Sequence, residues 1–176
     1  MTLTEAELTD LDRIRALHLR AFGEVEGKLV ANCAAALLTE ASDPSTIHLV
    51  AGIEGAVVGH VAFSPVRRKR PPQQIGHILA PLAVEPAWQQ RGVGSALVRE
   101  GLRRLRLSGS GIVFVYGDPG YYGRFGFTRE LAARFVPPHP LTQPAGWQAL
   151  GREPRPGADG PVAIECVAAL ASPALW

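Results

Sequence analysis

The residues with the clearest chemical potential form a glycine-containing turn, QQRGVGS at residues 89–95, which follows an apolar segment ending at Val84. Glycine has no Cβ, so a ligand can approach the backbone N–H groups of such a turn closely. The helix expected to begin here adds unpaired N–H donors and the positive end of its dipole. Together these groups predict an anion site, and a pyrophosphate is the anion that they suit.

Two familiar phosphate loops do not fit this turn. A P-loop needs a Gly-Lys-Ser/Thr sequence, which the chain lacks. A dinucleotide-binding fingerprint needs a third glycine where Leu97 stands, and an acidic residue about 20 residues further on, which is missing. The turn instead has the spacing Gln-x-x-Gly-x-Gly, after a strand that ends in the pattern L-x-V-x-P.

This spacing resembles the coenzyme A pyrophosphate loop of the GNAT superfamily of N-acetyltransferases. A second segment strengthens the resemblance, because GDPGYYGRFGF, residues 117–127, places Tyr122 four residues before Gly126-Phe127, as in that family. The shared pattern extends from about Leu79 to Phe127. The whole chain is similar to the small, single-domain bacterial members.

The resemblance implies an α/β structure, the acyl-CoA N-acyltransferase fold, in which helices flank a central mixed, mostly antiparallel sheet whose central strands splay apart. It implies one domain over residues 1–176, with the acetyl-CoA motif at about residues 75–130. The hydrophobic pattern predicts elements in the same order. Helices are expected at residues 9–22, 25–38 and 92–107, one helical turn at 121–125, and strands at 47–53, 57–63, 75–84, 112–116 and 162–167. Seven prolines predict loops over residues 135–161.

The resemblance also implies the residues that contact acetyl-CoA. The end of the 75–84 strand would line the pantetheine arm, the turn would hold the pyrophosphate, and three residues of the second segment would flank the arm on its far side. These residues are Leu82, Ala83, Val84, Gln89, Gln90, Arg91, Gly92, Val93, Gly94, Ser95, Asp118, Tyr122 and Phe125. The backbone N–H of Val84 would stabilise the oxyanion formed at the thioester carbonyl.

The chemistry needs an acid and a base. The leaving thiolate needs a proton, and the resemblance places Tyr122 to supply it. An amine must lose its proton before it attacks, because its pKa is about 10.4. The strand at residues 75–84 contains no acidic residue, so His77, the titrating side chain on that strand, is the candidate base. A base that acts through ordered water, or no base beyond solvent, stays open as an alternative.

The implied function is transfer of an acetyl group from acetyl-CoA to a primary amine, by direct attack in a ternary complex. The alternative is a catalytically weak acyl-CoA-binding sensor of the same fold. A third hypothesis, nucleic-acid binding, rests on nine Lys/Arg against two acidic residues between Arg67 and Arg106. It is not favoured, because no aromatic residues alternate with the basic run at residues 67–70. Neither the amine acceptor nor a homodimer can be decided from the sequence.

Composition narrows the class of protein further. With 47% hydrophobic and 19% charged residues, the 176-residue chain can bury a sizeable core. Cys33 and Cys166 are too few for a disulfide framework, and a reducing, cytoplasmic location is expected. The N-terminus lacks an apolar signal core and no apolar run could span a membrane, so no membrane association is expected. The five histidines have no metal-ligand spacing, so no metal site is expected.

Overall fold

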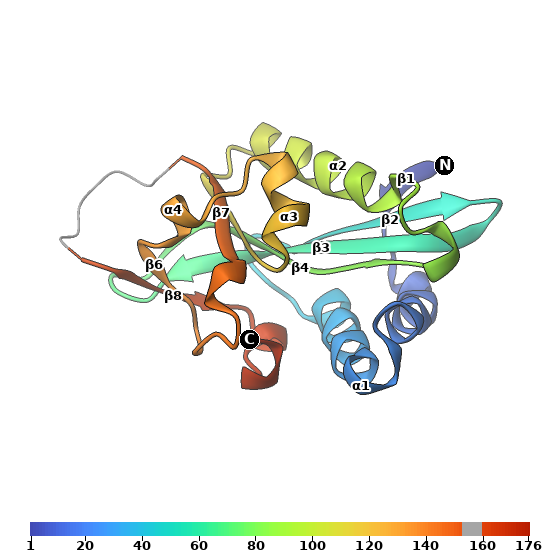
Figure 1. The fold of residues 1–176 in the computed structure, drawn as a ribbon, viewed down its shortest axis with the longest axis horizontal. Helices are drawn as coiled ribbons and strands as arrows, with labels where there is room; N and C mark the ends of the chain where they lie inside the picture. The colour runs from blue at the N-terminus through green and yellow to red at the C-terminus, as the bar shows by residue number, and fades with distance from the viewer. Residues whose placement is uncertain (153–159) are drawn as a thin grey trace.

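Eight strands form one mixed sheet in the computed structural model, which describes residues 1–152 and 160–176. The strands are β1 (Thr2–Glu5), β2 (Ile47–Ile53), β3 (Ala56–Arg68), β4 (Gln73–Val84), β5 (Ile112–Tyr116), β6 (Phe135–Val136), β7 (Trp147–Gly151) and β8 (Val162–Cys166). The α-helices are α1 (Leu11–Thr39), α2 (Val93–Leu107), α3 (Pro119–Tyr122) and α4 (Arg129–Ala132). Figure 1 shows the long strands β3 and β4 running between α1 and α2.

The strand order along the sheet is β1-β2-β3-β4-β5-β7, with β8 paired to both β3 and β6. All neighbours on the main path are antiparallel except β4 and β5, which run parallel. Parallel neighbours need a crossover connection, and α2 supplies it. The prediction of an α/β fold with a mixed, mostly antiparallel sheet flanked by helices is confirmed.

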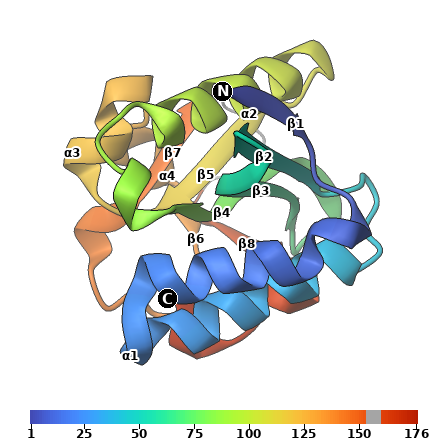
Figure 2. The ribbon, with the colours of Figure 1, turned by 90° about the vertical axis from the view of Figure 1, so that its right-hand side faces the viewer.

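Each face of the sheet carries one long helix (Figure 2). Successive side chains of a strand point to opposite faces, so Val61 and Phe63 of β3 pack in the core under α2 while Ala62 packs in the core against α1. The glycine at Gly101 brings α2 close to the sheet, because a Cβ there would lie 2.0 Å from the Phe63 ring. The apolar stripe of the sequence therefore positions α2, and with it the turn that precedes it.

The first two predicted helices are joined into α1, which is broken at one residue. Gly23 has non-helical angles of φ 71° and ψ −169°. A left-handed φ of this kind is readily adopted by glycine and costs other residues energy. The predicted boundary between the two helices at Gly23 is therefore confirmed, although a single kink takes the place of a loop.

The prediction of loops throughout residues 135–161 is wrong in part. β7 lies inside this stretch and pairs antiparallel with β5, and the two-residue β6 pairs with β8. Trp147 is buried and stacks on Phe114 with ring centroids 5.2 Å apart, so packing outweighs the local proline content. Residues 153–159 of the predicted loop lie outside the described residues. The short strand β1, which has one partly buried residue, was not predicted and depends on pairing with β2.

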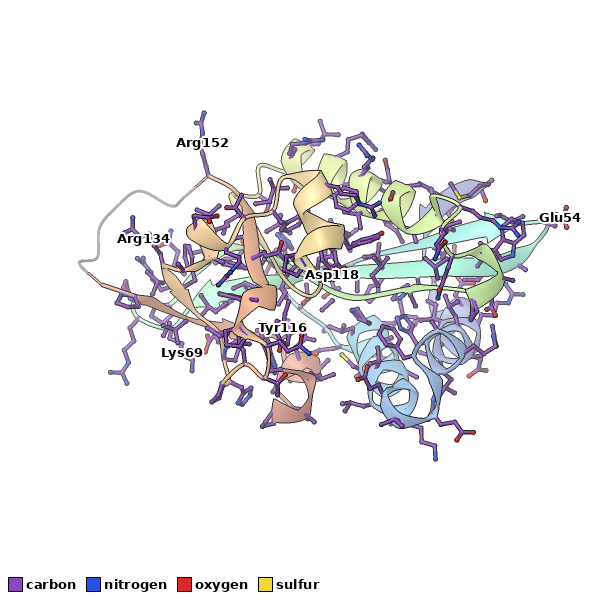
Figure 3. All side chains as sticks on the ribbon, in the orientation of Figure 1. Glu54, Lys69, Tyr116, Asp118, Arg134 and Arg152 are labelled. Carbon is purple, nitrogen blue, oxygen red and sulfur yellow. The ribbon has the colours of Figure 1, made fainter. Side chains whose placement is uncertain are left out.

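The basic run at residues 67–70 lies at one end of the molecule. Arg67 and Arg68 belong to β3 and lie opposite Gln74 and Gln73 at the beginning of β4. Figure 3 shows Lys69 at this end with Arg134 and Arg152, and Glu54 of the β2–β3 turn at the opposite end. In the part of the chain that the structure describes, no helix combines the length and apolar character that a membrane crossing requires.

Candidate active site

The end of β4 has one edge that no other strand covers. β5 pairs with β4 from Gly76 to Leu79 and no further, whereas β3 pairs with β4 as far as Val84. The register shift opposite Ala62 gives β4 two residues, Ala80 and Pro81, against one in β3, which is a β-bulge. Since a bulge bends the strand that carries it, β4 turns away from β5 where their pairing ends. The central strands are therefore splayed, as the fold class predicts.

Val84 directs its backbone N–H and C=O groups into the gap that the splayed strands β4 and β5 leave between them. The N–H of Glu85 bonds the carbonyl of Val58 at 2.9 Å, so these two residues form a hydrogen-bonded pair of the antiparallel ladder. Such pairs alternate with pairs whose N–H and C=O groups point away from each other. Ala83 therefore bonds to β3, whereas Leu82 and Val84 present their N–H groups to the side that β5 has left. β5, the strand on that side, pairs with no residue of β4 after Leu79.

The turn after β4 brings further N–H groups to the same end of the strand. Residues 86–88 form one turn of 3-10 helix, and the side chain of Gln89 donates to the Val84 carbonyl at 3.1 Å. Gln90 and Gly92 have left-handed φ values of 58° and 86°, which reverse the chain into α2. The side chain of Arg91 covers the Trp88 ring at 5.2 Å.

The helix α2 begins without a side-chain cap. Gly92 is its N-cap residue, and the first helical bond runs from the N–H of Ala96 to the Gly92 carbonyl at 2.9 Å. The N–H groups of Val93, Gly94 and Ser95 are therefore unpaired and converge at the positive end of the helix dipole. These donors could hold a pyrophosphate, as the sequence predicts.

The opposite wall of the gap comes from the segment that follows β5. The Asp118 carboxylate accepts the Gly120 N–H at 2.8 Å and so caps the N-terminus of α3. A Cβ built on Gly94 would lie 2.6 Å from the Tyr121 hydroxyl and 3.4 Å from Val84. Gly94 therefore faces both walls, and β4, the turn and α3 meet around it.

Tyr122 stands beside Tyr121, with the two ring centroids 4.9 Å apart and the rings nearly perpendicular. Its ring also packs edge-on against Phe127 and touches Gly117. Burial, and then the neighbouring Tyr121 and Asp118, raise the pKa of the Tyr122 phenol well above its ordinary value. The phenol thus keeps its proton at neutral and alkaline pH. Phe125 lines the same wall, and Arg99 and Arg124 each lie 5.5 Å from its ring.

His77 is the predicted site residue that the structure places elsewhere. It lies in the part of β4 that pairs with β5, seven residues before Val84, or about 23 Å along an extended strand. Its side chain is 4% exposed and its Nδ1 lies 2.8 Å from the Ser110 hydroxyl. Burial lowers the pKa of His77 to about 4. At this distance from Val84, the structure does not bring His77 together with the other predicted site residues.

Two features near the gap were missed from the sequence. Arg20 of α1 makes a bidentate ion pair with Glu85, with N–O distances of 2.9–3.0 Å, and so ties α1 to the end of β4. Next to it, His18, His48 and His60 form a buried hydrogen-bonded chain. Their separation in the sequence hides this contact, although the predicted hairpin already brings His48 and His60 to neighbouring positions.

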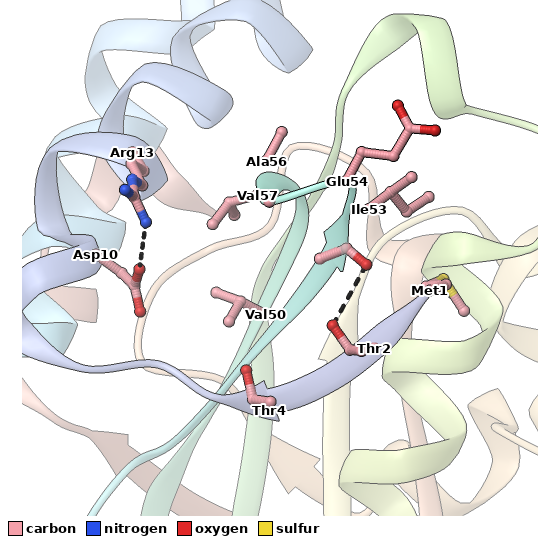
Figure 4. A pocket seen from close by; sticks show the side chains of 12 residues that line it. Met1, Thr2, Thr4, Asp10, Arg13, Val50, Ile53, Glu54, Ala56 and Val57 are labelled. Atoms are coloured by element: carbon pink, nitrogen blue, oxygen red, sulfur yellow. Dashed lines mark hydrogen bonds and ion pairs between the residues drawn. The ribbon is translucent and has the colours of Figure 1, made fainter.

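Among the described residues, a pocket also opens elsewhere on the surface. It lies between β1, the beginning of α1 and the β2–β3 turn, has a volume of about 570 Å³, and is bordered by the Asp10–Arg13 ion pair (Figure 4). None of the predicted site residues lines it. The gap at the end of β4 is therefore the place where the predicted groups meet.

Comparison with known proteins agrees with this geometry. The model of the acetyltransferase (GNAT) family matches residues 11–127, which is more than half of the chain. The chain belongs to the GNAT family of acetyltransferases. This GNAT acetyltransferase is 40% identical over 138 residues to the uncharacterized N-acetyltransferase YjhQ of Escherichia coli, a match that covers 77% of this chain and 74% of the relative. The family prediction is confirmed.

Two solved structures resemble this GNAT acetyltransferase along most of its length. The E. coli N-acetyltransferase YhbS in complex with CoA has a TM-score of 0.77 at 28% identity, covering 93% of this chain and 89% of YhbS. A GNAT acetyltransferase of Brucella melitensis in complex with acetyl-CoA has a TM-score of 0.65 at 34% identity, covering 92% and 94%.

Proposed function

We propose that this GNAT acetyltransferase transfers an acetyl group from acetyl-CoA to a primary amine, by direct attack within a ternary complex. The observation that carries the proposal is the uncovered edge of β4, where the N–H groups of Leu82 and Val84 face a gap. A pantetheine arm can pair with such an edge as an added strand would. The complexes of the two similar structures with acetyl-CoA and CoA support this choice of acyl donor.

The residues present fit acetyl-CoA in three places. The unpaired N–H groups of Val93, Gly94 and Ser95 suit the pyrophosphate, and Gly94 leaves space that a Cβ would fill between Tyr121 and Val84. The free N–H of Val84 suits the thioester carbonyl. A donor that is held in place before the reaction stabilises the oxyanion, and removal of one such donor typically costs about 3 kcal/mol.

Tyr122 is the proposed acid for the leaving thiolate. A phenol with a raised pKa remains protonated throughout the range in which the amine becomes deprotonated. Its ring is held by Tyr121 and Phe127, which fixes the direction of the hydroxyl.

The cysteines favour direct transfer over an acetyl-cysteine intermediate. Burial raises the pKa of the Cys33 thiol to about 11 and that of the Cys166 thiol to about 12. A thiol of this kind is a poor nucleophile at neutral pH, because the thiolate is the reactive form. Both residues also pack with the core on the α1 side of the sheet, away from the turn at residues 89–95.

Calorimetry and a thiol-release assay test the proposal. Gly92→Glu should weaken coenzyme A binding at least 100-fold, because it puts a negative charge at the helix N-terminus that the pyrophosphate would occupy. Gly109→Glu is the matched control, since Gly109 also has a left-handed φ and open space around it but follows the C-terminus of α2. Unchanged affinity in Gly92→Glu would contradict the binding site.

The assay offers acetyl-CoA with spermidine, tyramine, lysine or an alanyl peptide. Release of coenzyme A thiol that depends on one of these amines is the expected result. Binding of acetyl-CoA without amine-dependent release would contradict the transferase function and support the sensor alternative.

A further inference from the structure

Three histidines from three elements form a continuous chain on the α1 side of the sheet. His18 Nε2 of α1 lies 2.9 Å from His60 Nδ1 of β3, and His60 Nε2 lies 3.2 Å from His48 Nδ1 of β2. His48 Nε2 ends the chain 3.1 Å from the Leu37 carbonyl oxygen. His18 and His60 are 0% exposed and His48 is 7% exposed, so water does not compete for these bonds.

The Leu37 carbonyl determines the tautomer of every ring. A carbonyl oxygen only accepts, so His48 Nε2 carries the proton and His48 Nδ1 is the acceptor. His60 Nε2 must then donate to His48, and His18 Nε2 must donate to His60. The opposite set of tautomers would place the lone pair of His48 Nε2 against the lone pairs of the carbonyl. In the neutral chain, each histidine is therefore protonated at Nε2.

This order leaves one acceptor without a partner. His18 Nδ1 is buried and has no hydrogen-bond partner among the described residues. By the tautomer argument it carries a lone pair, which can accept a hydrogen bond or a proton. A buried acceptor without a donor is costly, so this atom points to a donor that the protein itself does not supply.

The chain ends beside the candidate site. His60 is the direct partner of Ala83, so the two side chains share the α1 face next to the free N–H of Val84. Arg20, two residues after His18, binds Glu85, the residue that follows Val84. Phe22 stacks on His18 and is half-buried, and the kink at Gly23 begins directly after it. The Arg20–Glu85 ion pair thus holds the turn of α1 that carries His18 next to the end of β4.

We propose that His18 Nδ1 is the proton acceptor for the incoming amine, with His60 and His48 as positioning residues that fix its tautomer. This inference rests on the proposed function. Among the described residues, the titratable groups next to His18 are His60 of β3 and, beyond it, His48 of β2. β4 places the uncharged Ala83 opposite His60. The charged groups nearest in the chain, Arg20 and Glu85, are paired with each other. Burial holds the pKa of His18 at about 4, so its lone pair is free at neutral pH.

The proton transfer conserves charge within the site. The ammonium group of the substrate breaks one N–H bond, directly or across one water, and His18 Nδ1 forms the new N–H bond. The positive charge moves from the substrate to the imidazole, so the net charge of the buried site is unchanged. The charge can then spread as the Nε2 protons shift toward His60 and His48, with the Leu37 carbonyl accepting at the end. The neutral amine attacks the thioester carbon, the C–S bond breaks, and the leaving sulfur takes its proton from Tyr122. The new amide nitrogen gives up its second proton, which restores the Tyr122 phenol, and His18 releases its proton to solvent.

His18→Gln separates this role from packing. The glutamine amide can donate to His60 Nδ1 in place of the imidazole Nε2–H, but it has no basic lone pair. With the amine that the wild type acetylates fastest among spermidine, tyramine, lysine and an alanyl peptide, kcat at pH 7 should fall about 100-fold. The deficit should shrink below about 10-fold near pH 10, where the amine loses its proton unaided. KM for acetyl-CoA should change less than about twofold.

If His18 had only a structural role, His18→Gln would lower kcat by the same factor at every pH. That result would overturn the proposal, and so would an unchanged kcat.

His139→Gln is the control, because His139 does not belong to the histidine chain and bonds the Ala171 carbonyl at 2.9 Å. The pH profile of this variant should match that of the wild type. Failure of the wild type to acetylate any of the four amines would instead contradict the proposed function. Nitrogen-15 NMR of the wild type gives an independent decision: His18, His48 and His60 should be protonated at Nε2, and a protonated His18 Nδ1 at neutral pH would overturn the relay.

Discussion

The two halves of β4 have similar apolar sequences but different neighbours. From Gly76 to Leu79 the strand lies between β3 and β5 and bonds to both. From Leu82 to Val84 it bonds to β3 on one edge and faces the gap on the other. The first half therefore has its backbone groups satisfied within the sheet, whereas the second half retains N–H groups that a ligand can use. In this protein the proposed binding site lies where the pairing of β4 with β5 stops.

Val84→Pro should show the largest effect of this difference. Proline removes the N–H that we propose faces the thioester, and kcat should fall about 100- to 1,000-fold while the protein remains folded. Ala83→Pro is the matched control, because Ala83 bonds to β3 and the same change should lower the melting temperature instead. A Val84→Pro variant that unfolds like Ala83→Pro would contradict the assignment of the free edge.

Tyr122→Phe should lower the activity from the other side of the gap, where α3 faces the unpaired end of β4. Loss of the phenol proton should lower kcat about 100-fold and leave the coenzyme A affinity within about twofold, because the ring contacts remain. Tyr121→Phe, measured beside it, should lower kcat less than about fivefold. Stopped-flow detection of thiol release distinguishes the two variants, and equal losses would argue against Tyr122 as the acid.

Gly76→Ala should damage the paired half. A Cβ there would lie 1.9 Å from the Ile112 carbonyl oxygen, which belongs to the backbone of β5 and cannot move aside. We expect the free energy of unfolding to fall by about 3 kcal/mol in urea titrations. Gly123→Ala, with no atom within 4 Å and an ordinary φ, should change it by less than about 0.5 kcal/mol. Equal stability of the two variants would contradict the close approach of β4 and β5.

Acid should destabilise the fold through two buried histidines, His77 of β4 and His18 of α1. Burial lowers the pKa of His18 and of His77 to about 4, below the value of 6.5 in the unfolded chain. The unfolded chain therefore binds more protons below pH 6.5, so this stability is fully present above pH 6.5 and is lost as the pH falls toward 4. The free energy of unfolding should decrease by at least about 2 kcal/mol between pH 7 and pH 5. A constant value over this range would contradict the burial of these side chains.

His77→Gln should have the smallest effect on catalysis. Its contact with Ser110 lies in the paired half, so we expect a loss of about 1 kcal/mol in stability and less than a twofold change in kcat. The acid dependence of unfolding should also become shallower, because one buried histidine is removed. A large loss of kcat would restore His77 as the candidate base.

Much of the fold could be predicted because the local signals are strong. α2 combines an apolar stripe with a glycine at its beginning, and its observed bounds differ from the predicted ones by one residue. β5 has the predicted bounds because it is a short, wholly apolar run between turn residues. β7 was missed because it depends on pairing with β5, which is distant in the sequence. The residues of β7 themselves carry no strand signal strong enough to outweigh the prolines around them.

The candidate site divides in the same way. The anion turn at residues 89–95 and the position of Tyr122 follow from spacing along the chain, since a helix N-terminus and a short motif are local features. The burial of His77 beside Ser110 could not be read, because the two residues are 33 positions apart in the chain. The histidine chain needs α1 folded over β2 and β3, which brings together residues 12 and 42 positions apart.

By itself, the sequence determined the family, the order of the main elements and the anion-binding turn, because hydrophobic periodicity and glycine placement act over a few residues. The tertiary structure alone decided where β4 separates from β5, which N–H groups stay free, and which histidine keeps an unpaired acceptor. These features depend on where the pairing of β4 with β5 stops and on which side chains of distant elements come into contact. Neither is encoded by a pattern of neighbouring residues.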